Sequence, residues 1–219
     1  MADNTKKWME ISRSYRIHLR LEKHLAENTV DSYMRDLAAF AHFILRMYDL
    51  PPVKVEPEMI SKYMVRLYDI GREKSSQARA LSSIKSFYNY LLITERIQQL
   101  PTEDIEPPKA VRLLPDVLSV EEIDAMLSTF DITTSKGCRD SAIVEVLYSC
   151  GLRVSELTTL RIDNLFFGEG VIRIVGKGDK QRLVPIGSVA RERVMLYIDD
   201  RGAKDAKGQD ILFLSNRGK

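Results

Sequence analysis

The sequence predicts a mainly α-helical protein with two domains and a small antiparallel sheet in the second. Helical periodicity runs through the first hundred residues, whereas short β-type runs are confined to the second half of the chain. Between them lies a stretch that contains Pro101, Pro107, Pro108 and Pro115. Proline fixes its own backbone and pushes the preceding residue out of the α region, which favours an extended linker. We therefore expect a helical domain at residues 1–100, a linker at 101–117 and a second domain at 118–219.

Composition narrows the class of protein only a little. The 219 residues carry 33 basic and 31 acidic side chains, so bulk charge barely argues for nucleic acid. Two cysteines give no disulfide framework and fit a reducing compartment, and no apolar run is long enough to span a membrane. The chain start does not resemble a signal peptide. We therefore expect a cytoplasmic protein with no membrane partner. Its three histidines lack a cluster of carboxylates and cysteines, so no metal site is expected.

Four helices are expected in the first domain, near residues 7–25, 29–48, 57–70 and 75–95. Asn28 is the expected N-cap of the second helix, whose apolar residues recur at helical spacing. The third helix is expected to begin at Pro57, because proline is favoured in the first helical turn, and to stop at Gly71.

The fourth helix carries the first indication of a nucleic-acid surface. Lys74, Arg79 and Lys85 occur in a segment that has no acidic residue from Lys74 to Thr94. The face opposite its apolar residues carries small hydroxyl side chains, which are Ser75, Ser82, Ser83 and Ser86. Small residues let a helix backbone approach phosphates, and an arginine among them can reach a guanine edge. The plainer alternative is an ordinary solvated helix face.

Helices also open the second domain. Ser119 and Glu122 form a capping-box pattern at the start of a short helix. The next helix is expected at residues 137–150, with Gly151 as its C-cap. A further short helix, capped by Ser155, is then expected.

Three β-type segments follow, at residues 163–167, 171–175 and 182–186, before a final helix at 188–201. The last two segments flank Gly176-Lys177-Gly178-Asp179-Lys180, whose glycines are typical of a hairpin turn. The sequence therefore predicts a small antiparallel sheet with Lys177 at the tip of its hairpin.

Arg153 and Lys177 are two cations of different chemical character. Phosphoryl transfer needs fixed positive charges beside the oxygens on which charge develops. The planar guanidinium of Arg153, held in a turn bounded by Gly151, can grip two oxygens and stays protonated. Lys177 can carry a transferable proton and act as a general acid toward a departing alkoxide. Lys180 and Arg182 beside it are expected to hold backbone phosphates.

The alternative interpretation of these cations is structural. Arg153 and Glu156 have the i,i+3 spacing of an ion pair within a helical turn, and the hairpin can be a basic surface turn. For either cation alone this alternative is favoured. Only their joint pattern points to phosphate chemistry.

Four segments together resemble the tyrosine recombinases (phage-integrase family), most closely its Xer-like members. Residues 139–157, which include Gly151-Leu152-Arg153-Val154-Ser155-Glu156, resemble the family's first catalytic-arginine box, and residues 176–185 resemble its β-hairpin lysine segment. Residues 28–33 and 79–88 resemble its core-binding domain. The resemblance implies an all-helical, SAM-like core-binding domain followed by the N-terminal part of a mixed α+β recombinase catalytic domain.

The resemblance also implies a function and roles for single residues. It implies site-specific recombination of duplex DNA through a covalent 3′-phosphotyrosyl intermediate, by a homo- or hetero-tetramer of recombinases on two DNA sites, without metal or other cofactor. By matching position, Arg153 would be the first catalytic arginine, Lys177 the general acid and Glu156 a supporting acidic residue. The expected DNA-binding residues are Thr29, Arg79, Ser82, Lys85, Lys180 and Arg182.

The chain departs from the family pattern after the lysine segment. The family's second box needs His-x-x-Arg, then a His or Trp, then the nucleophilic tyrosine, yet no histidine follows His42. The one tyrosine after Lys177 is Tyr197, for which a buried helix position is expected. As given, the chain is therefore expected to bind DNA without cleaving it, as the result of truncation.

Two alternatives to a recombinase remain open. The first is a non-catalytic DNA-binding protein derived from the same scaffold, which regulates or competes at recombination sites. The second and weaker alternative is a helix-turn-helix regulator, which gives no reason for the lysine in the hairpin.

Overall fold

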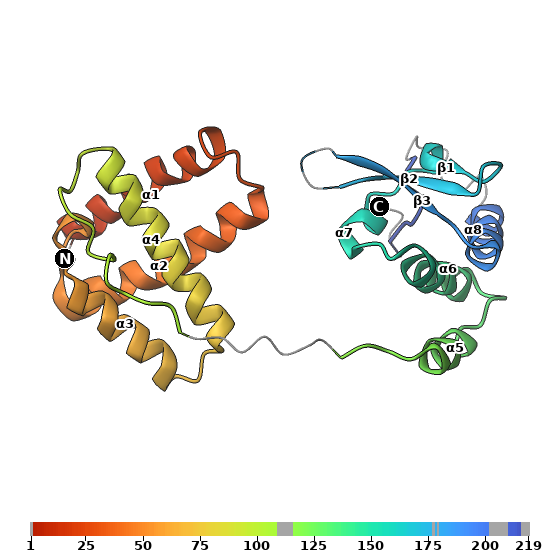
Figure 1. Cartoon of the computed structure of the whole chain (residues 1–219), viewed down its shortest axis with the longest axis horizontal. Helices are drawn as coiled ribbons and strands as arrows, with labels where there is room; N and C mark the ends of the chain where they lie inside the picture. The colour runs from red at the N-terminus through yellow and green to blue at the C-terminus, as the bar shows by residue number, and fades with distance from the viewer. Residues whose placement is uncertain (1, 109–115, 177, 179, 202–209, 216–219) are drawn as a thin grey trace. The chain divides into compact units, whose positions relative to one another are not determined.

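A computed structural model describes residues 2–108, 116–176, 178, 180–201 and 210–215. The chain forms two compact units, Met1–Leu114 and Pro115–Lys219. Each unit has its own hydrophobic core. Figure 1 shows the helices and strands of both units.

In its described residues, 2–108, the first unit contains helices and no strand. Its elements are α1 (Ala2–Leu21), α2 (Glu27–Tyr48), the 3-10 helix η1 (Pro52–Lys54), α3 (Pro57–Asp69) and α4 (Lys74–Ile93). An aromatic cluster fills the core, in which Trp8 stacks on Phe87 with ring centroids 5.7 Å apart and meets Phe40 edge-on. The Trp8 indole N–H donates to the Leu50 carbonyl, which joins α1 to the segment after α2.

The starts and faces of two helices differ from the expectation. Asn28 is not an N-cap, because α2 begins at Glu27 and Ala26 already adopts the extended backbone of a cap position. In α4, Ser83 is fully buried and donates to Asp36, while Ser86 accepts a hydrogen bond from the Tyr15 hydroxyl. The prediction that both serines lie on an outer face is therefore wrong, because α4 packs against more than one helix.

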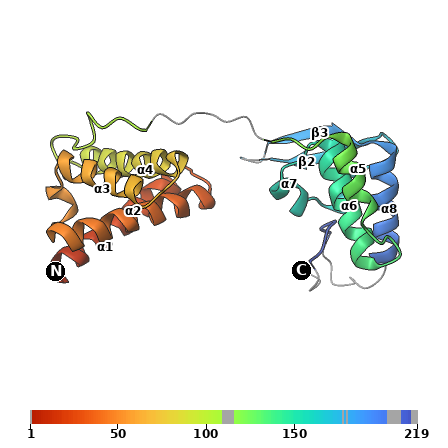
Figure 2. The same cartoon turned by 90° about the horizontal axis from the view of Figure 1, so that it is seen from below.

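The second unit combines helices with a small sheet. It contains α5 (Val120–Ser128), α6 (Ser135–Cys150), α7 (Val154–Thr158), η2 (Ile162–Asn164), β1 (Leu165–Phe166), β2 (Val171–Val175), β3 (Gln181–Pro185) and α8 (Ser188–Arg201). The three strands are antiparallel in the order β1-β2-β3, and Val171 pairs with Pro185 in the register of the hairpin. Figures 1 and 2 both show α6 and α8 side by side, and Ile172 and Ile174 of β2 join their shared core.

Local sequence signals account for most helix ends of this unit. The Ser119–Glu122 capping box is formed as predicted, with both reciprocal hydrogen bonds present. Gly151 ends α6 with a left-handed backbone at φ +59°, as expected for a glycine C-cap. Ser155 is not the cap of α7, because the helix begins at Val154 and Arg153 takes the N-cap position.

The fold is therefore mainly α with a small antiparallel sheet, as the sequence predicts. Tyr197 occupies the buried position expected for it: it is 5% exposed and stacks on Phe213, with its hydroxyl accepting from the Leu214 N–H. Cys138 and Cys150 are free and buried. None of the helices in the described part of the chain has the length and apolar character needed to cross a lipid bilayer.

Candidate catalytic turn and DNA-contact surfaces

The turn between α6 and α7 presents Arg153 to solvent. Gly151 reverses the chain, Leu152 is buried as an anchor, and Arg153 takes the N-cap position just before α7. The Arg153 side chain is 78% exposed. The turn therefore fixes the backbone of this arginine and leaves its guanidinium accessible.

The Glu156 carboxylate forms the centre of the site, because two arginines share it. Its Oε2 accepts from the Arg153 backbone N–H at 2.9 Å and its Oε1 accepts from Arg153 Nη1 at 3.0 Å. Arg182 on β3 donates from Nη1 and Nη2, at 2.8 and 2.9 Å, to the two carboxylate oxygens. Glu156 itself is 5% exposed, so the network is anchored below the surface.

These contacts shift the pKa values of Glu156 and Arg182. The hydrogen bond from Arg182, followed by that from the Arg153 backbone, lowers the pKa of Glu156 to about 2. The same contact with Glu156 raises the pKa of Arg182 above its ordinary value. Glu156 therefore stays ionised at neutral pH, and the three side chains together carry one net positive charge.

The hairpin that follows lies next to this network. Its closing hydrogen bond joins the Gly176 N–H to the Lys180 carbonyl at 2.8 Å, and Lys180 is exposed. Lys177, the expected general acid, lies outside the described residues. A side chain added at Gly176 would lie 3.5 Å from Glu156 Oε1, so the base of the hairpin borders the carboxylate. The structure thus brings Arg153, Glu156 and Arg182 together.

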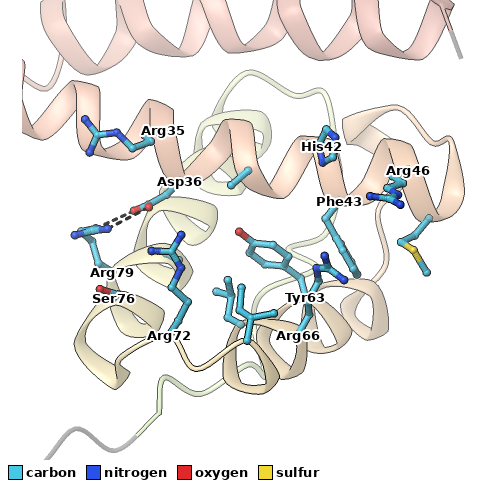
Figure 3. Close-up of a pocket in the computed structure, with 15 residues that line it drawn as sticks. Arg35, Asp36, His42, Phe43, Arg46, Tyr63, Arg66, Arg72, Ser76 and Arg79 are labelled. Carbon is cyan, nitrogen blue, oxygen red and sulfur yellow. Dashed lines mark hydrogen bonds and ion pairs between the residues drawn. The ribbon is translucent and has the colours of Figure 1, made fainter.

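A basic groove of about 390 Å³ occupies the surface of the helical unit between α2, α3 and the start of α4. It is lined by six cationic or titratable basic side chains, which are Arg35, His42, Arg46, Arg66, Arg72 and Arg79. Buried Phe43, Tyr63 and Leu67 contribute its apolar wall. Figure 3 shows these arginines around one opening, on the three helices and, for Arg72, on the connection between α3 and α4.

Most of this groove was not anticipated from the sequence. Only Arg79 belongs to the DNA-binding residues that the sequence predicts. One face of α2 carries Arg35, His42 and Arg46, which are spaced by seven and four residues. This spacing is the sequence pattern from which a basic face of α2 could be predicted. Arg66 and Arg72 join the group only through tertiary packing.

Arg79 is not free within the groove. It donates to both carboxylate oxygens of Asp36, with Nε 3.0 Å from Oδ2 and Nη2 3.4 Å from Oδ1 (Figure 3). The contact raises the pKa of Arg79. A guanine contact by Arg79 therefore requires that it leave Asp36 or bind DNA with its remaining donors.

The other expected DNA-binding residues of this unit lie elsewhere. Lys85 and Ser82 line a second hollow of about 320 Å³ beside Lys23. The exposed Ser82 hydroxyl donates to the Ala78 carbonyl of its own helix. Thr29 lies half-buried in the first turn of α2. The structure thus distributes the expected residues over more than one surface.

Comparison with known proteins identifies the family. Residues 13–95 match the phage integrase N-terminal SAM-like domain, and residues 116–219 match the phage integrase family. The chain is 40% identical over 212 residues to the tyrosine recombinase XerC of Pelobacter propionicus, covering 96% of the chain and 69% of that protein. It is 38% identical to the tyrosine recombinase XerD of Chlorobaculum tepidum, covering 100% of the chain and 73% of that protein.

Solved structures share the same fold. The Tn1549 transposon integrase in complex with transposon right end DNA matches with a TM-score of 0.74 and 18% identity, over 95% of this chain and 72% of that one. A lambda integrase tetramer bound to a Holliday junction matches with a TM-score of 0.72 and 15% identity, over 96% and 60%. The chain belongs to the tyrosine recombinase (phage integrase) family, with Xer recombinases among its relatives.

Proposed function

We propose that this chain contributes the DNA-binding and phosphate-gripping part of a site-specific tyrosine recombinase. The observation that carries the proposal is the exposed guanidinium of Arg153 on a backbone held by Gly151 and by the buried Glu156. A guanidinium so placed can grip the non-bridging oxygens of a phosphodiester while charge develops on them. Glu156 supports it, and the family pattern gives Lys177 the role of general acid.

The two units take different tasks in this proposal. Residues 1–100 form the core-binding domain, whose basic groove, with Lys85 and Thr29, contacts DNA phosphates and bases. Residues 101–117 link it to the catalytic part at 118–219, where Lys180 holds the backbone beside the site. Double-stranded DNA is the partner, and recombinases assemble as tetramers on two sites. The free buried thiols of Cys138 and Cys150 fit a cytoplasmic location.

Salt-dependent binding of duplex DNA tests this proposal. A protein that neutralises several phosphates loses affinity steeply between about 50 and 200 mM salt. We expect a strongly negative slope of log K against log salt, together with a smaller slope when Arg35, Arg46 and Arg66 are changed together to Ala. A chain that does not bind DNA, or that binds it without salt dependence, would contradict the proposal.

The position of Tyr197 favours DNA binding without DNA cleavage for the 219 residues taken alone. Its hydroxyl is enclosed and accepts from the Leu214 N–H, so it cannot attack a phosphodiester without local unfolding. The chain alone is therefore proposed to bind DNA without cleaving it. A nicked suicide substrate, which traps a covalent intermediate, should give no adduct.

A further inference from the structure

The two arginines that share Glu156 hold it unequally. Arg182 gives two hydrogen bonds, one to each carboxylate oxygen, in the bidentate arrangement that is strongest for this pair. The Arg153 guanidinium gives one, at 3.0 Å, and its side chain is 78% exposed against 41% for Arg182. Arg182 is thus the principal counter-ion of Glu156.

This inequality decides which arginine can leave. When a buried carboxylate loses its only cationic partner, the fold is strongly destabilised, because the remaining charge is neither solvated nor paired. Glu156 keeps a bidentate partner when the Arg153 guanidinium moves away. The Arg153 backbone meanwhile stays fixed by its own N–H, which donates to Glu156 Oε2. The guanidinium can therefore exchange one carboxylate hydrogen bond for a phosphate without losing its position.

We propose that Arg182 is a positioning residue, which neutralises Glu156 from β3 and thereby leaves the guanidinium of Arg153 available to a DNA phosphate. The inference rests on the proposed function, in which Arg153 contacts phosphate. In this inference Arg182 binds the Glu156 carboxylate, whereas the sequence predicts that it contacts a DNA phosphate directly. Removal of Arg182 leaves Glu156 to compete with DNA for Arg153.

The same contact links the hairpin to the catalytic turn. Arg182 is the second residue of β3, whereas Glu156 belongs to the five-residue helix α7, and Gly176 at the hairpin base borders Glu156 Oε1. Figure 1 shows α7 beside the β2–β3 hairpin. The Arg182–Glu156 pair therefore holds the start of β3 against α7.

A double-mutant cycle on duplex DNA affinity separates the two roles of Arg182. We expect Arg182→Ala and Arg153→Ala each to weaken binding by about ten- to a hundredfold, the scale of one charged hydrogen bond. The double variant should bind no more weakly than Arg153→Ala alone, because Arg182 acts through Arg153. Additive losses would show that Arg182 touches phosphate itself and would overturn the inference.

Charge rescue provides the matched control. Arg182→Ala combined with Glu156→Gln should recover the lost affinity, since the amide still accepts from the Arg153 N–H without competing for the guanidinium. Arg182→Ala combined with Glu192→Gln restores the same net charge at an exposed position of α8 and should recover little. Equal recovery in both pairs would reduce the effect to net charge and contradict the inference. Arg182→Lys, which cannot bind bidentately, should fall between wild type and Arg182→Ala.

Side-chain NMR of Arg153 tests the inference without DNA. In Arg182→Ala the relaxation of the Arg153 Nε–H resonance should indicate a less mobile side chain. The reason is that Glu156, without Arg182, binds the Arg153 guanidinium for a larger fraction of the time. Arg191→Ala, an exposed charge removal on α8, should leave that resonance unchanged. An Arg153 side chain equally mobile in wild type and Arg182→Ala overturns the inference.

Failure of the proposed function would look different. Absence of DNA binding in the wild type, or no effect of Arg153→Ala on that binding, contradicts the proposed function. Circular dichroism confirms that each variant is folded.

Discussion

Asp36 on α2 joins Arg79 and Ser83 on α4, accepting from Arg79 Nε at 3.0 Å and from Ser83 Oγ at 3.1 Å. The Asp36 side chain is 12% exposed and that of Arg79 is 50% exposed. One carboxylate thus fixes the spacing of two helices and restrains an arginine that would otherwise be open to a ligand. Among the described residues that line the basic groove, Asp36 is also the one acidic side chain.

Asp36→Asn should strengthen DNA binding while lowering stability slightly. The amide oxygen can still accept from Ser83, but the groove loses its negative charge and Arg79 is released. We expect the affinity for duplex DNA to rise up to about fivefold, the equivalent of an exposed ion pair worth about 1 kcal/mol. Glu10→Gln removes one negative charge at an exposed position of α1, as Asp36→Asn does in the groove. It is the control and should change the affinity for DNA less. Equal effects of the two variants would rule out a specific role for Asp36.

Glu156 should make the free energy of unfolding depend on pH in the acid range. Its pKa is lowered to about 2 in the fold, from an ordinary value of 4.5. A carboxyl group with a depressed folded-state pKa stabilises the fold above its unfolded pKa, and this stabilisation is lost as the pH falls from about 4.5 to about 2. Urea unfolding at a series of pH values should show a smaller loss for Glu156→Gln than for wild type. Parallel curves would mean that Glu156 is not the titrating group.

Local patterns predicted what local chemistry controls. The Ser119–Glu122 box and the Gly151 cap were predictable because their partners lie within a few residues. Ser83 was placed on the wrong face, because a helical wheel assumes one buried side, whereas α4 meets Asp36 of α2 and Tyr15 of α1. The pairing of Arg182 with Glu156 spans 26 residues and depends on how β3 folds against α7. The sequence predicts both residues as site residues, but their contact depends on the tertiary fold.

Gly151→Ala should destabilise the turn before Arg153 by about 1–2 kcal/mol, because an L-residue at φ +59° is strained. An added Cβ at Gly151 would meet nothing within 4 Å, so the loss is conformational rather than steric. Gly151→Asn should lose less, since asparagine enters the left-handed region more readily. Urea unfolding measures both variants. A loss as large for Asn as for Ala would show that backbone strain does not explain the glycine.

Tyr197→Phe should lower stability without changing any covalent reaction with DNA. The phenyl ring keeps its stack on Phe213, but the buried Leu214 N–H loses the hydroxyl that accepts its hydrogen bond at 3.2 Å. An unsatisfied buried donor costs about 1–3 kcal/mol, so the urea midpoint should fall. Wild type and variant should both fail to form an adduct with a nicked suicide substrate. Tyr148→Phe, which alters a more exposed hydroxyl on α6, is the matched control and should leave stability almost unchanged. An adduct present in wild type and lost in Tyr197→Phe would identify Tyr197 as the nucleophile, and the enclosed hydroxyl would then have to open for catalysis.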